Sequence, residues 1–167
     1  MRSALVLLSA ALLAVNACGG SNNNMSPSGT NGASVTASVS GSSFSGTRAV
    51  LATRSGNIVS VAATNSNNEN LGFAVVATAP GTFTIPGAPG QEGNNAFLVS
   101  GNVGSPGGWA ADYFKGSGTI KIDTLTATST SGTFSFTLVP TGANATAGNK
   151  TISNGKFNVT FTSAAGF

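Results

Sequence analysis

The chain has 167 residues, of which 7 are Lys or Arg, 4 are Asp or Glu and none is His. The lack of His excludes a Ser-His-Asp triad, a Cys-His dyad and every metal site that depends on imidazole. Charged residues make up 7% of the chain and 23 residues are Gly, whereas an average domain has about 25% charged residues. This composition is typical of a β protein built from small polar residues, and the length fits one domain.

The net charge of +3 comes from isolated cations and a shortage of acids. Nucleic-acid binding requires Lys and Arg clustered on one face, so we expect no nucleic-acid partner. A calcium site requires several acids in one loop, and no segment carries two within a few residues. We therefore expect neither a metal nor another cofactor.

The N-terminal segment has the pattern of a secretory signal peptide. Met1–Ser3 carries one positive charge, and Ala4–Val15 is apolar except for Ser9. A bilayer-spanning helix needs about 20 apolar residues, so this run is too short to be one. We expect residues 1–17 to be a signal peptide.

The only cysteine, Cys18, follows Ala17 directly at the end of this apolar run. The arrangement resembles a bacterial lipobox, in which the signal peptide is cut before Cys and the thiol carries a diacylglycerol. The alternative is an ordinary cleaved signal peptide followed by an incidental Cys. A lone Cys forms no internal disulfide, and acylation would remove its reactive thiol.

The residues after Cys18 indicate where such a protein would be held. Gly19 stands where Asp commonly marks inner-membrane retention. We therefore expect a lipid-anchored protein of the bacterial cell envelope, at the outer membrane and facing the periplasm. The Gly-, Ser- and Asn-rich residues up to 32 have almost nothing to bury, so residues 18–32 are expected to be the lipidated Cys and a flexible tether.

Residues 33–167 are expected to form a single β domain, because apolar and hydroxyl residues alternate along much of this stretch. The pattern is clearest in Ile120–Asp123, Phe134–Leu138 and Phe157–Phe161. Strict alternation is typical of antiparallel strands with one buried and one solvated face. We expect about nine or ten short strands in an all-β antiparallel sandwich or barrel.

Several local features follow from the same pattern. Gly108–Phe114 is expected to be a strand, and the residues from Pro140 to Asn149 a polar loop. Gly132 and Gly155 are expected at turns that require a positive φ, with Asn154-Gly155 as a two-residue hairpin. Lys121 and Asp123 share one strand face, which predicts a surface ion pair worth less than about 1 kcal/mol.

A set of motifs in a fixed order resembles a known family. The motifs are Gly81-Thr82-Phe83-Thr84, Trp109, Gly116-Ser117-Gly118-Thr119-Ile120, Ser131-Gly132-Thr133-Phe134-Ser135-Phe136 and Ile152-Ser153-Asn154-Gly155-Lys156-Phe157-Asn158-Val159. They are similar to those of an uncharacterised family of bacterial lipoproteins, catalogued as domain of unknown function DUF6252, over about residues 34–162. The resemblance implies a lipoprotein β domain and brings no catalytic residues with it.

The candidate ligand-binding residues are aromatic. Trp109 and Tyr113 are evenly spaced from Ala111, so the three would share one face of a strand. Together with Phe114, Trp109 and Tyr113 could stack on a sugar ring, and the same strand face can equally belong to the hydrophobic core. The core is the favoured interpretation.

Acid–base chemistry has few candidate residues, namely Glu69, Glu92, Asp112 and Asp123. A glycosidase needs two carboxyls roughly 5 to 10 Å apart, and only Asp112 and Asp123 lie on strands that could pair. We expect no enzyme and no catalytic residues.

Three hypotheses follow, of which the first is favoured. The chain is a structural or interaction module of the envelope, a carbohydrate- or small apolar ligand-binding lipoprotein, or an enzyme. The membrane, reached through a lipid at Cys18, is the expected partner, and the sequence leaves a protein or glycan partner unidentified.

Overall fold

The computed structural model describes residues 32–100, 107–142 and 147–162. These residues hold eleven β-strands, all paired antiparallel, and no α-helix, which confirms the predicted all-β fold with one or two strands more than expected. No helix in these three ranges is long and apolar enough to cross a membrane. The strands are β1 (Ser34–Val39), β2 (Ser42–Ser45), β3 (Ala49–Ser55), β4 (Ile58–Thr64), β5 (Asn70–Val76), β6 (Gly81–Ile85), β7 (Asn95–Ser100), β8 (Gly107–Ala111), β9 (Ser117–Leu125), β10 (Ser129–Thr141) and β11 (Lys150–Thr160).

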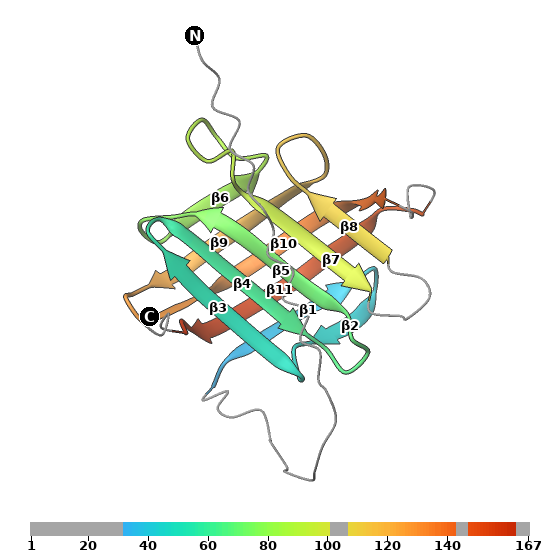
Figure 1. Ribbon diagram of the computed structural model, residues 1–167, viewed down its shortest axis with the longest axis horizontal. Coiled ribbons are helices and arrows are strands. Elements are labelled where there is room, and N and C mark those ends of the chain that lie inside the picture. The colour runs from blue at the N-terminus through green and yellow to red at the C-terminus, as the bar shows by residue number, and fades with distance from the viewer. Residues whose placement is uncertain (1–31, 101–106, 143–146, 163–167) are drawn as a thin grey trace, which may run out of the picture.

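The strands form one sheet that curls into two layers (Figure 1). The rear layer, sheet A, has the order β2-β1-β11-β10-β9-β6, and the front layer, sheet B, continues from β10 as β8-β7-β5-β4-β3. The 13-residue strand β10 belongs to both layers. Up to Leu138 it pairs with β9 and β11, and from Val139 to Thr141 it pairs with β8.

The side of the curl opposite β10 is held by contacts between the two layers. Thr162 donates from its backbone N and from its Oγ1 to the carbonyl oxygen of Ala52 in β3, at 3.0 and 3.1 Å. The Arg54 guanidinium donates to the carbonyl oxygen of Thr126 at 2.9 Å. The two Thr162 bonds satisfy part of the open edge of β3, which would otherwise be available to another strand.

A cluster of phenylalanines joins the two layers at the centre of the core. Phe73 of β5 is the contribution of sheet B, and its ring centroid lies 5.5 Å from that of Phe134, 6.1 Å from Phe136 and 5.2 Å from Phe157. All four side chains are at most 4% exposed. Tilted and edge-on rings at these separations are favourable beyond the area that they bury.

Two of these rings each cover a glycine on the neighbouring strand. In the register of β10 and β11, Gly132 lies opposite Phe157 and Gly155 opposite Phe134. A Cβ on Gly155 would lie 2.4 Å from the Phe134 ring, and one on Gly132 would lie 1.9 Å from the carbonyl oxygen of Lys121 and 2.9 Å from the Phe157 ring. The strands therefore carry reciprocal Gly-x-Phe motifs, in which each Phe occupies the space that the other's Gly leaves free.

This packing corrects the interpretation of the two glycines as turn residues. Neither has a positive φ, and both lie inside strands. Asn154-Gly155 is not a hairpin: it lies at an irregularity of β11 opposite Phe134–Phe136, and Asn154 itself has the positive φ, 52°. The hairpin prediction is wrong because an Asn-Gly pair occurs in β-bulges as well as in turns.

Two predicted element boundaries also change. The strand expected over Gly108–Phe114 ends at Ala111, because the Asp112 carboxylate accepts hydrogen bonds from the backbone N–H groups of Phe114 and Lys115 and forms a turn. The loop expected from Pro140 begins after Thr141, since Pro140 is still paired with Trp109.

The structure does not describe every segment that the sequence predicts. The predicted signal peptide 1–17, nearly all of the tether 18–32 and the end of the domain 33–167 lie outside the described residues.

A buried asparagine ties the two layers together near the irregular stretch that follows β6. Asn94 is 0% exposed. Its Oδ1 accepts from the backbone N–H of Val76 in sheet B at 2.8 Å, and its Nδ2 donates to the carbonyl oxygen of Thr84 in sheet A at 3.0 Å. The buried amide thus has both of its ends hydrogen-bonded, as a polar group away from water requires, and it links the two layers through their backbones.

Replacing this amide should destabilise the domain. For Asn94→Ala we expect a loss of about 2 to 3 kcal/mol in the free energy of unfolding, because a fully buried amide that bonds one backbone group in each layer is removed. Asn95→Ala is the control, since Asn95 is less buried and its amide binds only the nearby carbonyl of Gly93. Urea unfolding measures both variants. Equal losses in the two would contradict the bridging role of Asn94.

Candidate functional site

The outer face of sheet A is covered with hydroxyl side chains. One cross-strand row runs Thr84, Thr119 and Ser135 through β6, β9 and β10. A second row runs Thr82, Lys121, Thr133, Lys156, Thr36 and Ser45 across all six strands. This hydroxyl face follows from the alternation in the sequence, which sends the Phe, Ile and Val side chains of the same strands into the core.

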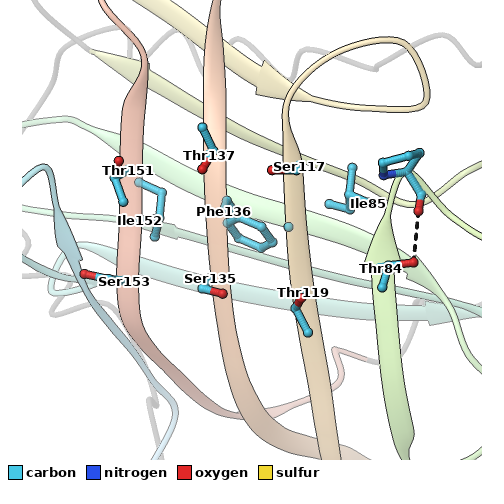
Figure 2. A pocket seen from close by; sticks show the side chains of 12 residues that line it. Thr84, Ile85, Ser117, Thr119, Ser135, Phe136, Thr137, Thr151, Ile152 and Ser153 are labelled. Carbon is cyan, nitrogen blue, oxygen red and sulfur yellow. Dashed lines mark hydrogen bonds between the residues drawn. The ribbon is translucent and has the colours of Figure 1, made fainter.

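A depression with a volume of about 610 Å³ lies on the hydroxyl face. Figure 2 shows that its side chains come from four adjacent strands, β6, β9, β10 and β11. Its hydroxyl groups belong to Thr84, Ser117, Thr119, Ser135, Thr137, Thr151 and Ser153. None of the twelve lining residues is ionisable, so the depression offers hydrogen-bond donors and acceptors but no base to activate a hydroxyl.

The four carboxylates each have a local partner. Asp123 pairs with Lys121 at 2.7 Å, which confirms the predicted surface ion pair, and the two side chains are 45% and 60% exposed. Asp112 accepts from two backbone N–H groups of its own turn. Glu69 accepts from the side-chain amide of Asn65 at 2.7 Å.

The fourth carboxylate, Glu92, lies in the loop between β6 and β7. Both of its oxygens are 3.0 Å from the backbone N of Gly90. This hydrogen bond, with one from the backbone N–H of Glu92 itself, holds the pKa of the carboxyl below its ordinary value. All four acids thus take part in turns, loops or ion pairs. In the part of the chain that the structure describes, no three potential metal ligands gather.

Trp109 lies at the margin of the core. Its ring packs partly buried against the core cluster, and its Nε1 donates to the carbonyl oxygen of Gly148 at 3.0 Å. The Lys150 ammonium stands over the ring, 5.1 Å from its centroid, at a distance typical of a cation–π contact. The favoured interpretation of Trp109 as a core residue agrees with this packing.

Tyr113 lies beyond the end of β8, in the turn built by Asp112. It is 51% exposed, and its ring meets that of Phe114 edge-on at a centroid distance of 5.3 Å. Phe114 is 91% exposed. The sequence pattern predicts Tyr113 on the same strand face as Trp109, with Phe114 beside them, and misses the turn that the Asp112 carboxylate forms after Ala111.

The described residues define a small all-β domain with a hydroxyl-covered outer face, an exposed aromatic turn and carboxylates engaged in local contacts. A family model described as Domain of unknown function (DUF6252) matches residues 31–160. The chain belongs to this family, as its motifs predicted. No curated protein and no solved structure matches the chain.

The burial of Trp109 is directly measurable because it is the only tryptophan. We expect acrylamide to quench its fluorescence several-fold less efficiently than that of free tryptophan, since one side of the indole packs against the core. A neutral quencher is needed because Lys150 would attract iodide. Quenching as efficient as that of the free amino acid would contradict the packing described.

Proposed function

We propose that the protein is a bacterial lipoprotein whose β domain is held at the outer membrane by a lipid on Cys18. The observation that carries this proposal is the place of the only cysteine, directly after a small residue at the end of a 12-residue apolar run. Two or three acyl chains, at about 0.8 kcal/mol per buried CH₂, suffice to hold a protein on a membrane.

The composition of the segment between Cys18 and the first strand fits the same arrangement. The first strand begins at Ser34, and the residues between Cys18 and this strand are mostly Gly, Ser and Asn. A flexible coil of about 14 residues has ends about 20 Å apart on average. The domain would therefore stand near the membrane and remain free to turn its faces toward other envelope components.

Within the envelope, we assign the domain a structural or interaction role rather than a catalytic one. The supporting observation is that each of the four carboxylates takes part in a local contact. Acid–base catalysis instead needs a pair of groups that face a shared cleft. The large outer faces of the two sheets are then the features with which the domain can meet a partner.

A carbohydrate- or small apolar ligand-binding role is the second candidate, and the exposed ring pair of Tyr113 and Phe114 favours it. Aromatic faces stack on sugar rings, and the turn at Asp112 places the two rings next to each other on the surface. If the domain binds such a ligand, Trp109 would contact it only through the exposed edge of its ring.

The lipid anchor has a direct test in metabolic labelling with radioactive palmitate. We expect the wild-type chain to be labelled and Cys18→Ala to lose the label completely, because no other thiol is present. Ser21→Ala, which changes a neighbour of Cys18 but leaves the thiol, should be labelled like the wild type. An unlabelled wild-type chain, or a labelled Cys18→Ala variant, would refute the anchor.

A further inference from the structure

The outer face of sheet B differs from the hydroxyl face in being largely apolar. Three aliphatic side chains are strongly exposed among the described residues, namely Leu51 at 50%, Ile58 at 39% and Val99 at 42%, and all three point outward from sheet B. The apolar face comprises the outward residues Ala49, Leu51, Thr53, Ser55, Ile58, Ser60, Ala62, Thr64, Asn70, Gly72, Ala74, Val76, Asn95, Phe97, Val99, Gly108, Ala110, Val139 and Thr141.

The centre of this face is a row of apolar residues that crosses six strands. The pairing runs Leu51, Ala62, Gly72, Phe97, Ala110 and Val139, from β3 to the last residues of β10. An antiparallel sheet with one solvated face normally has polar residues at such positions, as sheet A does. A contiguous apolar patch on a soluble domain usually marks an interaction surface.

The apolar face contains both a projection, the exposed side chain of Leu51, and a hollow. The Phe97 ring lies over Gly72, where a Cβ would come within 2.6 Å of it. Beside the ring, the small side chains of Ala62 and Ala74 leave a depression of about 120 Å³, and Leu51 stands at its margin. A symmetric dimer needs a patch that is complementary to itself, and a patch with a projection next to a hollow meets this requirement.

The charge distribution favours a second copy of the chain as the occupant. The full chain carries a net charge of +3, or +2 once Arg2 leaves with the proposed signal peptide, so two copies repel each other wherever their cations face. None of the outward residues of the apolar face that the structure describes is charged. Two arginines lie at β3: Arg48 precedes the strand and bonds Asn68, and Arg54 lies within it and bonds the carbonyl of Thr126 in the other layer. Like charges therefore need not meet across the interface.

The size of the face sets the strength of the association. Strands about 4.8 Å apart, with outward residues about 6.7 Å apart along each strand, give a face of roughly 500 Å². A standard stable interface buries about 800 Å² per partner. A dimer through this face would thus be weak in dilute solution, and it would form more readily where copies are held at high local concentration.

We infer that the apolar face is the interface of a symmetric homodimer, in which Leu51 of each copy packs into the depression beside Phe97 of the other. This inference goes beyond the proposed function, because the pairing of the two faces requires no lipid. Burial of the exposed aliphatic side chains supplies the driving force, at about 25 cal/mol per Å² of apolar surface.

The test is cysteine crosslinking in intact cells with a bismaleimide. Val99→Cys places an accessible thiol on the apolar face, and Thr119→Cys places one on the hydroxyl face. We expect Val99→Cys to give a covalent dimer and Thr119→Cys to give little. Adding Leu51→Arg to Val99→Cys should lower the crosslinked fraction by at least about five-fold, as expected when a central contact is replaced by a charge.

The wild-type chain, whose only thiol is Cys18, is the negative control. A crosslinked dimer of the wild-type chain would show that Cys18 carries a free thiol. That result would contradict the lipid anchor and would not bear on the apolar face. Any one of four results would overturn the inference. The first two are no dimer from Val99→Cys and equal dimer yields from Val99→Cys and Thr119→Cys. The others are a crosslink to a different protein and a dimer that survives Leu51→Arg. Ile58→Arg, also at an exposed position, replaces Leu51→Arg if that variant fails to accumulate.

Discussion

The reciprocal packing of Phe134 and Phe157 over Gly155 and Gly132 is the contact on which the rest of the structure depends. It fixes the register of β10 and β11, because a shift by one residue would place a ring against a side chain instead of a glycine. It also brings the two rings to the position where Phe73 of sheet B meets both. The same device recurs at Gly118 under Phe136 and at Gly72 under Phe97.

The core built in this way determines what each outer face can do. With the aromatic residues of sheet A turned inward, its outward positions are left mostly to Ser, Thr and Lys, with Asp123 and Asn158 among them, and this face stays polar. Sheet B instead has apolar residues on both sides, since Leu51, Phe97 and Val99 point away from the core. The two faces give the domain one solvated side and one side suited to contact with a partner, which is consistent with an interaction role in the envelope.

The sequence predicted the all-β fold, the strand alternation of the last third and the ion pair of Lys121 with Asp123, because each depends on residues close together in the chain. Three other features depend on residues far apart. They are the Gly–Phe pairs between β10 and β11, the amide of Asn94 between the layers, and the apolar row through six strands. Glycine before a strand is common turn chemistry, so its role under a ring becomes visible only once the register is known. The exposed aromatic turn of the candidate site was still harder to predict from the sequence, because the exposure of Phe114 depends on the turn that the Asp112 carboxylate forms.

The most direct test of this account is the free energy of unfolding of two glycine variants. For Gly155→Ala we predict a loss of about 1 to 3 kcal/mol, since the new Cβ has no room beside the Phe134 ring. Part of this loss should be recovered in the background of Phe134→Leu, where the two changes are coupled. Gly81→Ala, whose Cβ would have ordinary contacts at 3.6 Å, should stay within about 0.5 kcal/mol of the wild type. Equal effects of Gly155→Ala and Gly81→Ala, with no coupling to Phe134, would contradict the central role of the reciprocal pair.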